Sequence, residues 1–114
     1  MNIEDFYNYC LEKPFVKETF PFGEDTLVLK VKNKMFALCD INKFTFVNLK
    51  CNPERAIQLR EEYEGVQPGY HMSKVHWNSV YRDMDVPDKL FYELIDHSFE
   101  LIVKSLPKKD RFEL

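Results

Sequence analysis

The chain has 114 residues, of which 45% are hydrophobic, 15% are aromatic and only three are glycine. A chain of this size and composition folds as one globular domain, which excludes a disordered protein and a second domain. Its formal net charge of −3 excludes a chain that is basic overall, so any contact with nucleic acid needs a local basic surface.

The amino terminus and the cysteines bear on the cellular compartment. Residues 1–6 include acids where a signal peptide is basic and then apolar, and the longest apolar run, residues 35–39, is far shorter than the roughly 20 residues of a membrane span. Cys10, Cys39 and Cys51 lie in apolar patterns without metal-ligand spacing. We therefore expect an unprocessed, soluble, cytoplasmic protein with free thiols and no cofactor.

The first predicted element is a helix that begins after the capping residue Asn2 and ends near Lys13, before Pro14. Asp5 lies in the first turn, where a carboxylate is favourable. Apolar residues recur with the 3.6-residue period of one helix face, which must be buried against a sheet. These residues are Ile3, Phe6, Tyr7, Cys10 and Leu11.

Three strands are predicted next, at residues 26–31, 35–39 and 44–49. The first and third alternate apolar and polar side chains, whereas the middle strand is apolar on both faces. Residues 32–34 form a tight hairpin turn, in which asparagine tolerates a positive φ, and residues 40–43 form a second turn. The pattern predicts an antiparallel meander whose middle strand is covered on both sides.

A second helix is delimited by its end signals: Asn52 is the N-cap, Pro53 occupies the first helical position, and Gly65 lies just past the end. Residues 66–70 are expected to be extended, and residues 78–83 to form a short strand. The order of these elements places helices and strands in separate stretches of the chain, which is typical of an α+β fold.

The last predicted helix runs from about Pro87 to Leu106 and carries a broad apolar stripe, and Pro107 ends it. We assign residues 1–107 to a single two-layer α+β domain, with helices packed on an antiparallel sheet. Residues 108–114 are assigned to a charged tail that we expect to be loose.

The stretch GYHMSKVHWNSV, residues 69–80, holds two of the three histidines and the only tryptophan. His71 and His76 are five residues apart, which fits neither a helical nor a strand-face metal pair, so no metal site is predicted. His97 falls on the buried side of the last helix and is predicted to be a hydrogen-bonded core histidine.

Trp77 is predicted to be a buried anchor, and Ser73 to cap one helical turn that ends near it. The alternative is a stacking platform in which Trp77, Tyr70 and Tyr81 contact bases. In that reading a secondary basic patch contacts phosphates. The patch consists of Lys74, His76 and Arg82.

Catalytic motifs are missing from the sequence. The serines lack a glycine-flanked nucleophile elbow, there is no glycine-rich phosphate loop, and the cysteines have apolar rather than electropositive neighbours. We expect a monomeric, non-enzymatic protein without catalytic residues.

Lysines gather at the predicted hairpin ends. If two neighbouring tips point the same way, these lysines straddle a phosphate backbone and bind duplex DNA weakly and without sequence preference. The predicted nucleic-acid-binding residues are Lys30, Lys32, Lys34, Lys43 and Lys50.

Several separated motifs resemble the MmcQ/YjbR family, and the resemblance covers nearly the whole chain. They are TFPFGEDTLVLKV from Thr19, KMFAL from Lys34, NLKCNPE from Asn48, PGYHMSKVHWNSV from Pro68 and ELIDHSFELIVKSLPKK in the last helix. The resemblance implies a CyaY-like α+β fold related to frataxins, a double-wing DNA-binding motif with wings near residues 32–34 and 40–43, and no catalytic residue.

Three classes of function remain. In order of preference they are a DNA-binding module, a protein-interaction or small-ligand-binding module, and an enzyme. A frataxin-like acidic ridge that handles iron ranks below the DNA-binding reading, because fold alone does not carry function. The classes differ in what they require of the surface. DNA binding needs contiguous positive charge, ligand binding needs an apolar cavity, and catalysis needs a concave pocket with perturbed titratable groups.

Overall fold

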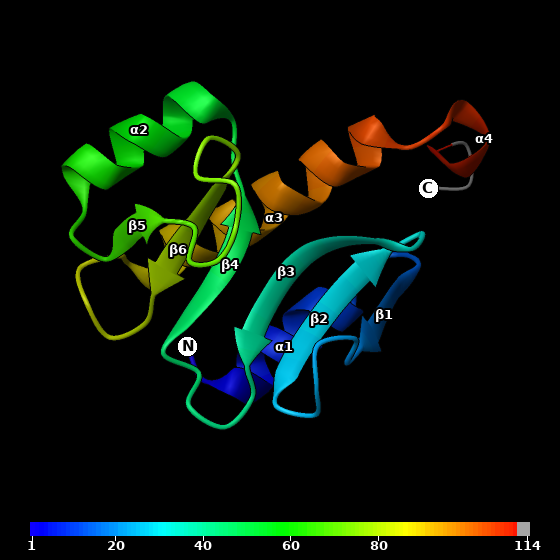
Figure 1. Cartoon of the computed structure of the whole chain (residues 1–114), viewed down its shortest axis with the longest axis horizontal. Helices are drawn as coiled ribbons and strands as arrows, with labels where there is room; N and C mark the ends of the chain where they lie inside the picture. The colour runs from blue at the N-terminus through cyan, green and yellow to red at the C-terminus, as the bar shows by residue number, and fades with distance from the viewer. Residues whose placement is uncertain (112–114) are drawn as a thin grey trace.

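The computed structural model describes residues 1–111. Its strands form one sheet in the spatial order β1-β2-β3-β4-β6-β5, and every neighbouring pair is antiparallel (Figure 1). This confirms the predicted α+β class. The elements are α1 (Ile3–Leu11), β1 (Val16–Thr19), β2 (Thr26–Val31), β3 (Lys34–Asp40), β4 (Phe46–Lys50), α2 (Pro53–Glu62), β5 (Val66–Pro68), β6 (Trp77–Tyr81), α3 (Asp88–Ser105) and α4 (Lys108–Arg111).

The main helices form as their end signals predict. The Asn2 side chain accepts a hydrogen bond from the Asp5 amide at 2.8 Å, and the Asp5 carboxylate caps the Asn2 amide in return, so α1 begins with a complete capping box. Asn52 caps α2 through the amides of Glu54 and Arg55. Within residues 1–111, no helix is long and apolar enough to cross a membrane.

One face of the sheet carries the main core. Alternate side chains of β2, β3, β4 and β6 pack there against residues of all three long helices, and Figure 1 shows α1 and α3 behind the strands. Phe36, Phe91 and Ile95 are almost fully buried in this cluster. On the opposite face, which we call the open face, residues 1–111 place no helix layer.

The sheet is divided where β3 and β4 meet, because only three residue pairs join these two strands. Beyond that short ladder, Ser98 of α3 lies between the strands. Its hydroxyl accepts a hydrogen bond from the Lys50 amide at 2.9 Å and donates one to the Phe36 carbonyl at 2.5 Å. A helix side chain therefore replaces ladder hydrogen bonds at this seam, and the two halves of the sheet diverge around it (Figure 1).

The hairpin turn between β2 and β3 is as predicted. Lys32 and Asn33 both have a positive φ, at 49° and 71°, and Val31 pairs directly with Lys34. This is the geometry of a two-residue turn that matches the twist of its strands. The third predicted strand starts later than expected, at Phe46, because Phe44 adopts a φ of 42° in the preceding turn.

Other expectations need correction. β1 was not predicted, because its four residues carry little signal until they pair with β2. The second apolar face of β3 is not covered by another layer, and Met35 and Leu38 remain half-buried there. The tail is not loose at residues 108–111, which form α4, and residues 112–114 lie outside the described part of the chain.

Candidate ligand-binding site

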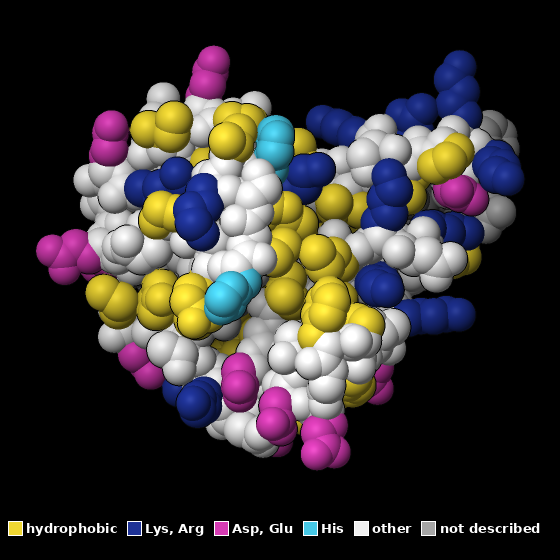
Figure 2. Space-filling view, in the orientation of Figure 1, with side chains coloured by type: hydrophobic (Ala, Val, Ile, Leu, Met, Phe, Trp, Pro, Cys, Tyr) yellow, Lys and Arg dark blue, Asp and Glu magenta, His cyan; other side chains and the backbone are white. Residues whose placement is uncertain are grey.

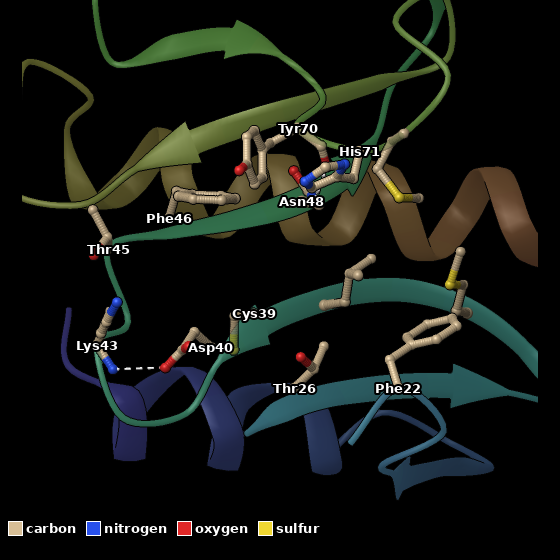
Figure 3. A pocket seen from close by; sticks show the side chains of 13 residues that line it. Phe22, Thr26, Cys39, Asp40, Lys43, Thr45, Phe46, Asn48, Tyr70 and His71 are labelled. Carbon is tan, nitrogen blue, oxygen red and sulfur yellow. Dashed lines mark hydrogen bonds between the residues drawn. The ribbon is translucent and has the colours of Figure 1, made fainter. Parts of the chain in front are cut away.

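The open face carries a pocket of about 510 Å³ at the seam between β3 and β4 (Figure 3). Its floor comes from the two strands, one wall is the loop after β5, and the opposite wall is the loop between β1 and β2. The uncovered apolar side of β3 thus faces a cavity. We call this cavity the seam pocket.

A buried polar network holds the loop wall in place. The Asn48 amide group donates to the Tyr70 carbonyl at 3.0 Å and accepts from the Ser79 hydroxyl at 2.5 Å, and Ser79 in turn accepts from the Tyr70 amide at 2.9 Å. Asn48 and Ser79 are buried, so each group left unpaired would cost stability. The network ties both backbone polar groups of Tyr70 to the sheet.

The same loop contains a strained residue. The Met72 amide donates to the Gly69 carbonyl at 3.1 Å, which closes a turn in which His71 has a φ of 58°. A non-glycine residue in this left-handed region costs free energy and persists only where its surroundings hold it. His71 lines the seam pocket, so the strain lies at the cavity itself.

Trp77 supports the base of the loop. It is buried, as predicted, with 9% of its surface exposed, but it lies outside the helix-side core cluster. A Cβ atom on Gly69 would come within 2.8 Å of the Trp77 Cβ atom, so only glycine allows this approach. The Trp77 amide donates to the Ser73 carbonyl at 2.9 Å, which confirms the predicted turn.

Arg60 of α2 fixes the far side of this loop. Its guanidinium donates to the Asn78 side chain at 2.7 Å and to the carbonyls of Lys74 and Trp77. The loop over the open face is therefore anchored at both of its ends. A binding surface built on such a loop is organised before a ligand arrives.

An aromatic row crosses the wall of the pocket. Tyr81 contacts Phe46 with ring centroids 4.9 Å apart, Phe46 contacts Tyr70 at 5.8 Å in an edge-to-face arrangement, and Tyr70 contacts His71 at 4.1 Å. Tyr70 is 57% exposed. The row presents aromatic surface to the pocket and leaves its edge accessible to solvent.

Asp40 is the fixed charge of the pocket. Its Oδ1 atom accepts hydrogen bonds from the backbone amides of Asn42 at 2.9 Å and Lys43 at 2.8 Å. The hydrogen bond from the Lys43 backbone amide is the largest cause that holds the pKa of the Asp40 carboxyl below its usual value. The carboxylate is therefore ionised at neutral pH, and the Lys43 side chain lines the same end of the pocket.

The remaining lining is mostly apolar. Met35, Leu38 and Met72 border the cavity, together with Phe22 from the opposite loop. Phe22 is 65% exposed, so its ring lies at the mouth of the pocket and remains accessible to solvent. The pocket thus has one charged end and one apolar end.

Among residues 1–111, the lining includes the thiol of Cys39, which is not activated as a nucleophile. Burial raises the pKa of the Cys39 thiol to about 12, so this sulfur stays protonated at neutral pH. The group with the clearest role is the ionised Asp40, whose lowered pKa makes it a poor general base.

The five predicted DNA-binding lysines do not share one end of the sheet. Successive turns of an antiparallel meander lie at opposite ends, so the turn that carries Lys43 is remote from the Lys32–Lys34 hairpin (Figure 1). Lys30 and Lys50 lie within or at the end of strands and are half-buried. The condition for a shared phosphate-binding surface, that neighbouring tips point the same way, is therefore not met.

The hairpin instead meets the carboxyl-terminal helices. The Lys34 ammonium donates to the Ser105 carbonyl at 3.3 Å, which brings the hairpin beside the end of α3. Figure 2 shows Lys and Arg side chains gathered in this region. We call it the basic end, and it comprises Lys32, Lys34, Lys104, Lys108, Lys109 and Arg111.

The secondary patch does not form one surface either. Lys74 and His76 precede β6, whereas Arg82 follows it and lies near Asp83 and the Phe44 ring. The Lys74 ammonium is used within the loop, where it donates to the Gly69 carbonyl at 2.7 Å.

The histidines have separate places in the fold. His71 and His76 are exposed, and within residues 1–111 no group of three or more His, Cys, Asp or Glu side chains is placed to hold a metal ion. His97 accepts a hydrogen bond from the Asn52 amide at 3.1 Å, as predicted for a satisfied histidine, although it is only half-buried.

Comparison with known proteins places the chain among relatives of one kind. The YjbR family model matches residues 11–101. The chain is 38% identical to the Escherichia coli O157:H7 protein YbdF, over 90% of this chain and 84% of that one. It is 33% identical to YjbR of Escherichia coli K12, over 97% and 95% of the two chains.

Solved structures agree with this assignment. A crystal structure of the Deinococcus radiodurans protein DR2400 is similar, with a TM-score of 0.92 and 39% identity, over 98% of this chain and 86% of that one. A Pseudomonas syringae protein gives a TM-score of 0.75 with 29% identity, over 89% and 98% of the two chains. On sequence and on fold, the chain belongs to the YjbR family.

Proposed function

We propose that this chain is a non-enzymatic binding protein that takes a small amphipathic ligand in the seam pocket. The observation that carries the proposal is an apolar cavity with one fixed charge, bounded by a loop that buried hydrogen bonds hold in place. Its volume of about 510 Å³ lies within the range of small-molecule pockets. The cavity supports the ligand-binding alternative, because an apolar cavity is what such a module requires.

A fragment screen by two-dimensional NMR tests this proposal. Fragments that bind are expected to shift the amide signals of Leu38, Asn48 and Tyr70, which lie on the floor and wall of the pocket. Leu38→Phe fills the floor and is expected to abolish those shifts. The matched control is Ile57→Phe, because Ile57 is exposed on α2 outside the pocket lining. Binding that survives Leu38→Phe, or shifts confined to other surfaces, would contradict the proposal.

The basic end favours a second candidate function, weak and non-specific binding of duplex DNA. Its cations come from three elements that the Lys34–Ser105 hydrogen bonds bring together, so they form a local positive region on a chain of net charge −3. Lysine contacts with phosphates release counterions, so such binding depends strongly on salt. This candidate replaces the five-lysine surface with a different group that retains Lys32 and Lys34.

A salt-dependent DNA titration tests this second candidate. The double variant Lys32→Glu with Lys34→Glu is expected to weaken binding equally for all sequences and to flatten the slope of log affinity against log salt by about two. The matched control reverses two charges elsewhere, with Lys43→Glu and Lys74→Glu, and is expected to leave the slope nearly unchanged. Absence of binding by the unmodified protein at about 50 mM salt removes the DNA candidate.

A further inference from the structure

The charges around the seam pocket indicate which kind of ligand it accepts. We propose that the ligand is a small organic cation: an ammonium-type head carried on an apolar ring or chain. This inference rests on the proposed ligand-binding function and adds its chemical class. The head lies at Asp40, and the apolar part lies along the methionine-lined end of the cavity.

Asp40 is prepared to receive a cation. Both of its hydrogen bonds from residues 1–111 go to Oδ1, so the orientation of the carboxylate is set while Oδ2 accepts none from this part of the chain. The carboxyl remains ionised at neutral pH because its charged form is the one that the two amides stabilise. A fixed anion with a free oxygen in a partly enclosed site is a partner for a charged donor.

Neighbouring acids give this end of the pocket a negative balance. The Asn42 side chain donates to the Asp25 carboxylate at 2.7 Å, and the Ile41 amide donates to the Asp25 carbonyl at 2.9 Å, so Asp25 lies beside the Asp40 turn. Figure 2 shows Asp and Glu side chains along this lower edge of the open face. Lys43 is the opposing cation at the pocket, and its side chain is exposed.

The aromatic wall suits the same charge. Phe46 and Tyr70 bring ring surface to the same pocket as Asp40, and ring faces attract cations, more strongly as water is excluded. An anion would gain nothing from these faces. A carboxylate and aromatic rings on the same cavity therefore both favour a positive head group.

The apolar end accommodates the rest of the ligand. Met35 and Met72 have flexible, polarizable side chains that adapt to different shapes, and Leu38 supplies a fixed apolar floor between them. This end of the pocket therefore favours an apolar tail but does not select one tail shape. The pocket is accordingly selective for charge at one end and tolerant of shape at the other.

Three probes that share one phenyl-butyl skeleton test the charge of the ligand: phenylbutylammonium, phenylpentanoate and phenylbutanol. Each is titrated into the full chain at neutral pH and followed by NMR at the pocket amides. The ammonium is expected to bind more tightly than the neutral alcohol, and the carboxylate more weakly. Tighter binding of the carboxylate or the alcohol would overturn the cation assignment while leaving the seam pocket as a binding site.

Two variants sharpen the result. Asp40→Asn keeps an oxygen for the two backbone amides and is expected to weaken ammonium binding about five- to tenfold, with little effect on the alcohol. Lys43→Ala removes an exposed cation and is expected to strengthen ammonium binding about twofold. Asp83→Asn is the matched control, because it makes the same change of charge at an exposed turn outside the pocket lining.

The outcomes separate the two proposals. Equal effects of Asp40→Asn and Asp83→Asn on ammonium binding would overturn the role of Asp40. Weaker ammonium binding by Lys43→Ala would contradict the expected repulsion between Lys43 and a cationic head, and with it the cation assignment. If no probe binds at millimolar concentration, the cation assignment fails. The fragment screen with Leu38→Phe then decides separately whether the pocket binds other ligands.

Discussion

The two faces of the sheet are built in different ways although the same strands supply both. On the helix side, apolar side chains of the strands meet those of α1, α2 and α3 and are excluded from water. On the open face, the buried side chains include Asn48, Ser79 and Trp77, and a loop rather than a helix covers part of them. Packing dominates one face, and hydrogen bonding to a loop dominates the other.

This difference separates stability from binding. Close-packed cores leave little space for a ligand, whereas a loop held by a few polar contacts can stand over a cavity. The helix side is therefore expected to carry most of the free energy of folding. The open face is expected to carry the binding function, at the cost of a strained His71 and of the exposed aromatic residues Phe22 and Tyr70.

The largest expected effects come from truncating one large aromatic residue on each face. Trp77→Ala and Phe91→Ala should each lower the free energy of unfolding by about 3–5 kcal/mol, because both side chains are buried and leave a cavity. Urea denaturation measures the loss. Only Trp77→Ala should also abolish fragment binding in the seam pocket, measured at a temperature where both variants are folded.

The native protein offers a direct check on that difference. Trp77 fluorescence should be protected from acrylamide, because only 9% of the residue is exposed. Strong quenching in the native state would contradict its role as the base of the loop. It would favour instead the stacking role that the sequence leaves open.

Ser98→Ala tests the junction between the faces. The change leaves the Lys50 amide and the Phe36 carbonyl without their partner inside the protein, which should cost about 1–3 kcal/mol of stability. Ser73→Ala is the control, since it makes the same change at an exposed serine of the loop before β6. Equal urea midpoints for the two variants would show that the seam does not depend on Ser98.

Asn48→Ala tests the polar network of the open face. It removes the partner of the Ser79 hydroxyl and of the Tyr70 carbonyl, so we expect a loss of about 1–2 kcal/mol. Hydrogen exchange at the Tyr70 amide should become faster, because its acceptor Ser79 loses its own anchor. Unchanged exchange at Tyr70 would mean that Gly69 and Arg60 hold the loop without the network.

The smallest expected effect is a pH dependence on the helix side. Burial is the main cause that lowers the pKa of His97 in the folded chain, so folding favours its neutral form. The stability it contributes is present above its unfolded pKa of about 6.5 and is lost as the pH falls below that value. The melting temperature should therefore decrease as the pH is lowered from about 7.5 to about 5.5.

His97→Gln isolates this contribution. Glutamine offers an oxygen to the Asn52 amide but does not titrate, so the variant should lose less melting temperature over the same pH range. The exposed His71 and His76 are common to both proteins and drop out of the comparison. Identical pH profiles would assign no pH dependence to His97.

Local sequence determined the elements whose signals lie within a few residues. Asn2 and Asp5 form the capping box of α1, Asn52 and Pro53 start α2, and Asn33 permits the tight hairpin turn. Apolar periodicity likewise predicted the long last helix, observed as α3 at Asp88–Ser105. Such features need only short-range hydrogen bonds, restricted dihedral angles and the period of one apolar face.

The candidate site was only partly visible in the sequence. The sequence singles out Tyr70, His71 and Lys43 only as separate residues, and the pattern of residues 35–39, apolar on both faces, predicts a covered strand rather than a pocket floor. For Asp40 the sequence predicts only a position in the turn of residues 40–43. No local pattern reports that these residues share one cavity, because they come from loops and strands that are far apart in the sequence.

Tertiary structure decided what depends on the partners of each segment. β1 became a strand because β2 offers it an edge, and Ser98 became a link between two strands because α3 crosses their seam. The reversal of chain direction at each hairpin sent Lys43 to the end of the sheet opposite Lys34. Long-range hydrogen bonds and strand direction decide these features, and the residues of one segment alone determine neither of them.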